Sequence, residues 1–270
     1  WIGYQDKNIH HLPFPYPWKT SEKDAEKFLE KSLKSLKKKI NLKKDICGVM
    51  FETFQGWGAI FYPLKYIQLF EKICKKNKIL IAFDEMQAGF SRTGKNFGFE
   101  HYKVKPDIIC CGKGMGGGIA VSGVIGKKKI MDLPEVGDMS STNSANPIAC
   151  SAGLAVIEEI QEKKLTNESK KKGLYLHKGL KKIQKKIPNH FNVYGKGLIA
   201  SMVFDKRIFN INNKLKLVVE EAMKSGLLLC YTGRESIKIG PPLTITKEAL
   251  DEGLLVIEKS VKKVFLNEQD

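Results

Sequence analysis

Three short apolar runs, each followed by charged or glycine-rich residues, are the clearest pattern in the chain. They cover residues 46–51, 79–83 and, after a leading aspartate, 107–111. Continuous apolar runs of this length are typical of strands buried on both faces of a parallel sheet. Apolar residues at helical spacing between the first two runs predict a helix over about 62–77. Strand, helix and strand in this order predict a right-handed βαβ unit.

A charged side chain follows each predicted strand. Glu52 follows the first run, Asp84 follows the second, and Lys113 stands two residues beyond the third. Because ligands in open α/β sheets bind outside the carboxyl ends of the strands, we expect these side chains to face one crevice. The ammonium of a lysine in a crevice is costly to desolvate, so its pKa can fall until the amine becomes a nucleophile that forms a Schiff base.

This combination suits pyridoxal phosphate chemistry. That chemistry uses a lysine aldimine together with a carboxylate that keeps the pyridine nitrogen protonated. Asp84 and Lys113 fit the two roles by residue type and by expected position. If these two residues are considered alone, an exposed strand-end acid and an ordinary loop lysine remain the alternative.

The rest of the chain predicts helices around this sheet and a second, smaller region. Thr20 or Ser21, with Asp24, predicts the cap of a first helix, and Asn146 with Pro147 predicts the start of another that ends near residue 163. After a lysine-rich stretch, helices alternate with strands. The helices are expected at about 168–186, 213–225 and 246–264, and the strands at 191–194, 198–204, 226–230 and 236–239.

These elements predict an α/β fold with two domains. We expect residues 1–165 to form a mostly parallel sheet flanked by helices, and residues 166–270 to form a smaller α+β C-terminal domain.

The net charge of +17 raises the possibility of nucleic-acid binding. Arginine usually supplies the forked contacts to phosphates and bases, yet 46 basic residues include only Arg92, Arg207 and Arg234. The lysines are spread along predicted helix faces, so we expect no nucleic-acid partner. No apolar stretch reaches the roughly 20 residues of a membrane helix, and we expect no membrane association.

The six cysteines and five histidines show no metal-ligand spacing, so no metal site is expected. The cysteines lie mostly in apolar runs and are predicted to be buried free thiols, which indicates a reducing compartment and a cytoplasmic location. Gly112, Gly114 and Gly117 match a dinucleotide-binding pattern. The strand-like residues 121–126 follow them instead of a helix, so we expect these glycines to let the backbone pass close to a cofactor.

Three longer strings decide between these possibilities. AFDEMQAGFSRTGKNFGFEH, KPDIICCGKGMGGG and SSTNSANPIACSAGLAVIEEI occur in this order along the chain. They resemble the class III pyridoxal-phosphate-dependent aminotransferases, over a stretch that runs from about residue 46 to the C-terminus. The resemblance implies the fold-type I architecture and a pyridoxal 5'-phosphate cofactor.

The resemblance also implies roles for individual residues. Lys113 matches the lysine that forms the aldimine and moves the substrate proton, and Asp84 matches the partner of the pyridinium nitrogen. Gln87 matches a neighbour of the cofactor's ring oxygen. Thr142 matches a threonine that contacts the cofactor phosphate from the other subunit, which implies a homodimer with active sites at its interface.

The chain departs from the family at the expected substrate contacts. Glu52 matches a family glutamate, but Trp57 stands where members that use glutamate carry a second acid, and Lys238 stands where they carry an arginine. Lysine lacks the planar fork of arginine, so we expect altered recognition of the substrate carboxylate, by Arg234 or by Lys238 as a point charge. A loop aromatic packed on the core remains the alternative for Trp57.

The resemblance implies transamination between an amino acid or amine and a keto acid or aldehyde. An aminomutase or epimerase on the same scaffold would share every residue named above, and a truncated or non-catalytic relative is a further alternative. In the family, a longer N-terminal part carries the phosphate cup and the aromatic residue that stacks on the cofactor. Neither is visible here, so we expect this chain to correspond to the C-terminal two-thirds of a subunit.

Overall fold

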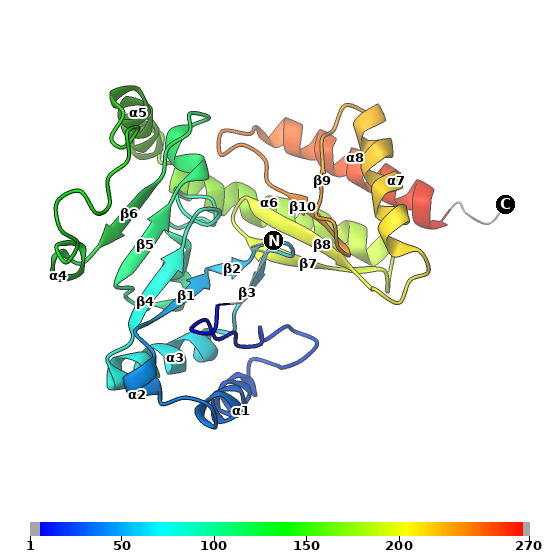
Figure 1. Ribbon diagram of the computed structural model, residues 1–270. Helices are drawn as coiled ribbons and strands as arrows, with labels where there is room; N and C mark the ends of the chain where they lie inside the picture. Colours follow the sequence, from blue (N-terminus) through cyan, green and yellow to red (C-terminus); the bar gives the residue numbers. More distant parts are fainter. Residues whose placement is uncertain (1–5, 267–270) are drawn as a thin grey trace.

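The computed structural model describes residues 6–266, which form two four-stranded sheets with helices around them (Figure 1). In the first sheet the strand order is β1-β4-β5-β6. The first three strands are parallel, and the last is antiparallel to its neighbour. Its strands are β1 (Gly48–Glu52), β4 (Leu80–Asp84), β5 (Ile108–Cys111) and β6 (Gly123–Gly126). The predicted mostly parallel sheet is confirmed.

The helix α3 (Leu64–Asn77) connects β1 to β4, as the predicted βαβ unit requires. It packs with α1 (Ala25–Lys37) against one face of the sheet, where large apolar side chains from all three layers form one core. Along the chain, two short antiparallel strands, β2 (Phe54–Gln55) and β3 (Ile60–Phe61), come between β1 and α3.

The opposite face of this sheet is open, which corrects the prediction that the strands are buried on both faces. Phe51 and Phe83 point into the helix-covered core, with exposed fractions of 7% and 0%. Met50 and Val124 lie on exposed backbone positions instead, at 59% and 52%. Successive side chains of a strand alternate between faces, so residues 50 and 51 necessarily point to opposite sides. No helix among the described residues covers Met50.

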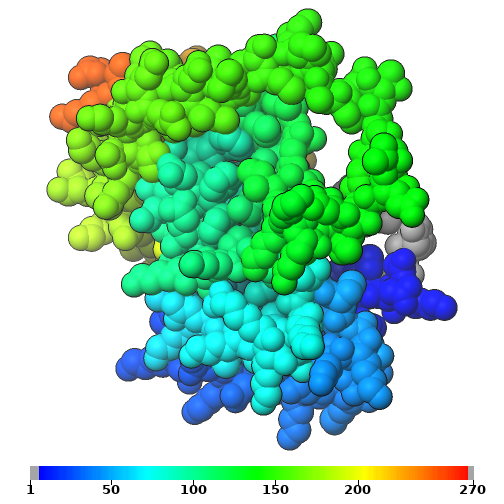
Figure 2. Space-filling view, turned by 90° about the vertical axis from the view of Figure 1, so that its left-hand side faces the viewer, coloured from blue at the N-terminus to red at the C-terminus, as the bar shows by residue number. Residues whose placement is uncertain are grey.

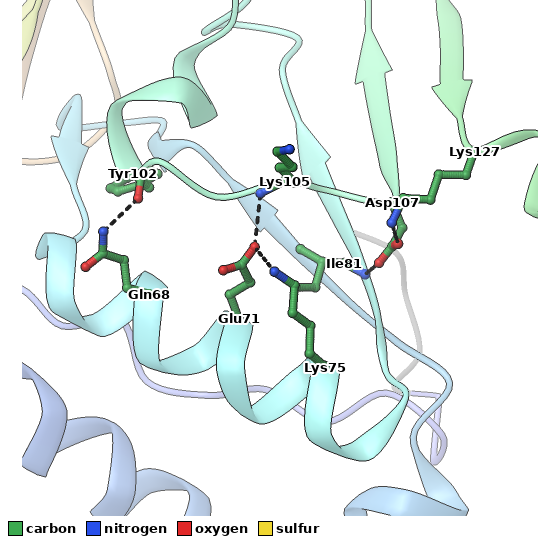
Figure 3. Close-up of polar contacts among 8 residues, drawn as sticks. All are labelled: Gln68, Glu71, Lys75, Ile81, Tyr102, Lys105, Asp107 and Lys127. Carbon is green, nitrogen blue, oxygen red and sulfur yellow. Dashed lines mark hydrogen bonds and ion pairs between the residues drawn. The ribbon is translucent and has the colours of Figure 1, made fainter.

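Polar contacts at the edges fasten α3 and the strands together (Figure 3). Glu71 of α3 accepts a hydrogen bond of 3.0 Å from the backbone N–H of Lys105. Asp107 accepts one of 2.9 Å from the N–H of Ile81 and forms an ion pair with Lys127. Because Asp107 stands at the amino end of β5, this contact helps to fix the alignment of β5 beside β4.

The second sheet is antiparallel and has the strand order β7-β8-β10-β9. Every residue of β8 is buried, and the helices of this region share its core. The strands are β7 (Phe191–Lys196), β8 (Ile199–Phe204), β9 (Cys230–Tyr231) and β10 (Ser236–Ile239), and the helices are α6 (Leu165–Lys186), α7 (Ile211–Lys224) and α8 (Lys247–Leu266). The predicted α+β region is confirmed, except that the strand expected over 226–230 is reduced to β9.

Of the two predicted helix starts, the one at Asn146 is confirmed and the one at Thr20 or Ser21 is wrong. Asn146 caps α5 (Pro147–Glu162) by accepting a hydrogen bond of 2.9 Å from the backbone N–H of Ile148, as expected. The first helix begins at Ala25, so Thr20 and Ser21 do not cap it. Ser21 instead donates a hydrogen bond of 2.6 Å to Asp24, within the turn that precedes the helix.

The short helices are α2 (Leu42–Asp45), α4 (Lys128–Met131), η1 (Gly98–Tyr102) and η2 (Lys113–Gly116). No helix within residues 6–266 is both long enough and apolar enough to cross a membrane. The cysteines are free as predicted, but Cys47, Cys150 and Cys230 are exposed rather than buried. Each of these three lies at the end of an element or on an outer helix face, where its apolar neighbours do not cover it.

Arg92 holds the two sheets together. Its Nη1 donates to the backbone oxygen of Leu198 at 3.0 Å and also to that of Pro241. A Cβ at Gly197 would lie 2.3 Å from the backbone of Thr93, and Gly197 has φ of +57°. Only glycine suits such an approach in that conformation. The loop after β4 is therefore fixed against the second sheet at this point.

Candidate active site

The first sheet brings the predicted strand-end residues together. In the register of the sheet, Glu52 stands opposite Asp84, and Asp84 stands opposite Cys110. Side chains two residues apart on a strand point to the same face of the sheet. Glu52 therefore lies on the open face with Met50, and Asp84 lies there with Ala82, which is paired with Met50. Both line a small cavity whose other walls are Thr53, Phe54, Met86, Gln87, Ala88 and Lys113.

Backbone geometry places Lys113 at this cavity. It is the first residue of η2 and has φ of 45°, in the left-handed region. The preceding Gly112 has no room for a side chain, because a Cβ there would lie 2.4 Å from Sδ of Met86. The Lys113 side chain is exposed, and no other described residue forms a hydrogen bond or ion pair with its ammonium. The amine is therefore available to a ligand.

Lys113 and Gln87 also line a larger cavity of about 920 Å³, which is bounded by α5 and by the loop after β10. Gly114 in this wall is open, since the nearest atom to a Cβ there would be Cβ of Phe90 at 3.9 Å. The site thus combines an exposed amine, a strand-end carboxylate and an amide beside a large space. These groups fit an aldehyde-bearing pyridine ring such as that of pyridoxal phosphate.

Glu52 and Asp84 have different surroundings. The Asp84 carboxylate accepts a hydrogen bond of 2.9 Å from the backbone N–H of Met86, which orients it. Burial, and then the charge of Asp84, raise the pKa of Glu52. The backbone N–H of Gly56 and the charges of Lys113 and Lys238 lower it in part. The charges of Asp84, Lys113 and Lys238 therefore all act on the Glu52 carboxylate.

The sequence did not reveal the role of Glu85, the neighbour of Asp84. Its side chain is fully buried, and burial raises its pKa. Its carboxylate accepts hydrogen bonds from the Thr53 hydroxyl and from the backbone N–H groups of Gly98 and Phe99, the latter two at 2.7 and 2.9 Å. Adjacent strand-end residues point to opposite sides, so alternation alone could have indicated that only one of the two acids reaches the crevice.

Lys238 reaches the site from the second sheet. Its Nζ donates to Oε1 of Gln87 at 2.9 Å and to the backbone oxygen of Gly56 at 3.1 Å. The structure therefore brings Lys238 close to Gln87 and Glu52. The resemblance placed Lys238 and Glu52 among the substrate contacts but did not indicate the bond from Lys238 to Gln87.

Trp57 and Arg234 lie next to each other outside the cavities that contain Lys113. Trp57 is 9% exposed and packs against Ile60 and Val203. The Arg234 guanidinium lies over its ring, 4.3 Å from the centroid. Tyr16 accepts a hydrogen bond of 3.3 Å from the indole nitrogen. This is the packing expected for the alternative in which Trp57 is a loop aromatic on the core.

Thr142 is also separate from the other predicted site residues. It lies in the exposed segment between α4 and α5. Figure 2 shows this segment as part of the green arm at the right. Its neighbours Ser141 and Asn143 line a further cavity together with Lys113, whereas Thr142 itself does not. Among the described residues, Thr142 therefore shares no cavity and no hydrogen bond with Asp84, Gln87 or Lys113.

His101 lies in η1, and its surroundings favour the neutral form of its ring. Nε2 of His101 lies 3.2 Å from the backbone oxygen and 3.1 Å from the hydroxyl oxygen of Thr93. Burial, and then the charge of Lys196, lower the pKa of His101 to about 4. These contacts connect His101 to the loop that follows β4.

We expect His101 to make stability depend on pH. Its pKa is about 4 in the folded chain against an ordinary 6.5, so the unfolded chain binds more protons between these values. Stability contributed by neutral His101 is complete above pH 6.5 and is lost as the pH falls toward 4. With partial exposure discounted, the loss should be about 1–2 kcal/mol. Urea unfolding from pH 7.5 to 4.5 should show a smaller loss for His101→Gln, with His11→Gln at an exposed position as the control.

Comparison with known proteins identifies the family. A profile described as "Aminotransferase class-III" matches residues 2–261. An acetylornithine aminotransferase of Caldanaerobacter subterraneus subsp. tengcongensis is 35% identical, over 82% of this chain and 54% of the relative. A leucine/methionine racemase of Thermococcus litoralis is 36% identical, over 95% of this chain and 60% of the relative.

The fold agrees with solved structures. The ornithine delta-aminotransferase of Plasmodium falciparum superposes with a TM-score of 0.79 and 30% identity, over 88% of this chain and 61% of that one. The chain therefore spans between half and two-thirds of the length of these relatives.

Proposed function

The chain belongs to the class III aminotransferases, and on that premise we propose that it transfers an amino group with the help of pyridoxal phosphate. The donor would be an amino acid or amine, and the acceptor a keto acid or aldehyde. The observation that carries the proposal is the placement of Asp84 and the free Lys113 amine at the ends of adjacent parallel strands, beside one cavity.

Each polar residue of the crevice would have a distinct task. Bound pyridoxal phosphate would supply an electron sink for the negative charge that forms at the substrate carbon. Lys113 would bind the cofactor covalently and then carry a proton to and from that carbon. Asp84, oriented by the Met86 N–H, would place a negative charge against the ring nitrogen. Gln87 would contact the ring oxygen.

We also propose which residues contact the substrate. Glu52 stands at the rim of the cavity, close enough to Lys113 and Lys238 for their charges to lower its pKa. It is placed to contact the incoming amine. Trp57 and Arg234 stack on each other outside the cavities that contain Lys113, and we propose that they contact the part of the substrate farthest from the reacting carbon. We assign cofactor binding chiefly to residues 1–165, and the contributions of Lys238 and Arg234 to residues 166–270.

A homodimer would complete this site. The helix α5 is apolar but has only one buried residue, Gly153, and its Ile148 and Leu154 are 73% and 57% exposed. Such a face is typical of a surface that a second subunit covers. A neighbouring copy would bring its Thr142 to the cofactor phosphate, and the site would lie at the interface. We propose that this dimer works in the cytoplasm.

Racemisation is the second candidate. It is favoured by the leucine/methionine racemase, which matches more of this chain than the acetylornithine aminotransferase does. The two reactions share the loss and return of a proton at the substrate carbon. They differ in whether nitrogen leaves the donor.

Nitrogen tracing separates the two reactions. The protein with pyridoxal phosphate is incubated with ¹⁵N-labelled L-amino acids and with pyruvate or 2-oxoglutarate, and the products are resolved on a chiral column. We expect ¹⁵N in the amino acid formed from the keto acid. Formation of the D-amino acid without nitrogen transfer would indicate the racemase, and neither product from any donor would indicate a non-catalytic relative.

A further inference from the structure

We propose that Lys238 is a positioning residue that fixes the side-chain amide of Gln87, so that Gln87 presents its NH₂ group to a ligand held at Lys113. The inference deepens the proposed function and rests on it for the identity of that ligand, a cofactor with an acceptor oxygen on its ring. It assigns Lys238 a task other than gripping the substrate.

The first step is the direction of the hydrogen bond. An ammonium group has three donors and no acceptor, whereas a glutamine amide has one oxygen and two N–H donors. Nζ of Lys238 lies 2.9 Å from Oε1 of Gln87. The reversed amide would place two donors against each other and lose a charge-assisted bond. The lysine therefore determines which end of the amide faces it.

The second step is the position of the opposite end of the amide. An ideal Cβ at Gly56 would lie 3.0 Å from Nε2 of Gln87 and 2.9 Å from a carboxylate oxygen of Glu52. Both side chains therefore converge on the bare backbone of Gly56. Gln87 also lines both cavities that contain Lys113. With its oxygen held by Lys238, the group that it can offer to those cavities is a donor.

The third step is the state of Lys238 itself. The backbone oxygen of Gly56 accepts a second hydrogen bond from Nζ, at 3.1 Å. Two of the three ammonium donors are thus used by the protein, from a half-buried side chain on β10. A carboxylate that enters the site finds a single donor here and no bidentate fork. Lys238 is better arranged to orient Gln87 than to anchor a substrate.

The consequence is selectivity for the ligand atom beside Gln87. A ring oxygen that carries negative charge accepts from Nε2 and is stabilised further by the nearby ammonium. A ligand that presents a donor at this point meets an amide that cannot turn to receive it, because turning would break the bond to Lys238.

Nuclear magnetic resonance of the cofactor-free protein tests the orientation directly. The side-chain NH₂ signal of Gln87, identified by its absence in Gln87→Ala, should move in Lys238→Met and return toward its original position in Lys238→Arg. The control is Lys196→Met, which removes an ammonium that lies over the Phe61 ring. A Gln87 signal that is unchanged in Lys238→Met would overturn the proposal, whether or not the protein binds pyridoxal phosphate.

Cofactor affinity then tests the consequence. Lys238→Met and Gln87→Ala should each weaken pyridoxal phosphate binding by about 3–10-fold, as expected for one lost hydrogen bond. If Lys238 acts through Gln87, the double variant should be no weaker than Gln87→Ala alone. Additive losses would contradict the proposal. A parent protein that does not bind pyridoxal phosphate, with the expected resonance shift intact, would refute the proposed function and leave the positioning role standing.

Discussion

Lys113→Ala should reduce the rate of amino-group transfer by about 10³–10⁴-fold, the largest effect of any single substitution in this chain. The variant loses both the amine that binds the cofactor covalently and the group that moves the substrate proton. Lys113 is exposed and has no hydrogen-bond partner among the described residues, so its removal should leave the fold intact. The measurement is the initial rate of ¹⁵N transfer with saturating pyridoxal phosphate.

The matched control is Lys127→Ala. Lys127 follows β6 and pairs with Asp107, at the opposite end of the sheet from Lys113. Its loss should leave the rate within a factor of about two, since exposed ion pairs contribute little. Equal losses in both variants would show that general surface charge, and not the position of Lys113, determines activity.

Asp84→Asn should lower the same rate by about 10²–10³-fold, the second-largest effect. Asparagine has nearly the same shape, and its side-chain oxygen can still accept from the Met86 N–H, so the loop should keep its conformation. It cannot supply the negative charge that holds a proton on the ring nitrogen. The loss should therefore appear in kcat more than in the affinity for the cofactor.

The control for this variant is Asp107→Asn at the amino end of β5. It weakens the contacts to Ile81 and Lys127 and so tests whether a damaged sheet alone reduces activity. Its thermal midpoint should fall while kcat stays near that of the parent. If Asp84→Asn keeps the parental kcat, Asp84 is not the partner of the ring nitrogen.

The strand ends are the part of the site that sequence predicts well. An apolar run that ends in a charged residue indicates both the strand and the end of the sheet at which that residue stands. Glu52, Asp84 and the loop of Lys113 accordingly lie together at one edge of the sheet. The cap of α5 was predictable for a similar reason, because Asn146 and Pro147 act on their own local backbone.

Contacts between distant segments were not predictable in this way. The bond from Lys238 to Gln87 joins residues 151 positions apart, and no local pattern records it. The same holds for Arg234 on Trp57 and for the link from Arg92 to Leu198. The open face of the sheet was mispredicted because an apolar residue such as Met50 shows only that a face can be covered. It does not show which residues cover that face, and among the described residues none covers Met50.

Chemical trapping of the cofactor tests whether Lys113 is the residue that binds it. The protein is incubated with pyridoxal phosphate, reduced with borohydride, digested, and mapped by mass spectrometry, beside the Lys113→Ala variant. We expect a pyridoxyl group on Lys113 as the dominant product, in preference to the many surface lysines, and its loss in the variant. Absence of the label, or a label spread over other lysines and unchanged in Lys113→Ala, would contradict it.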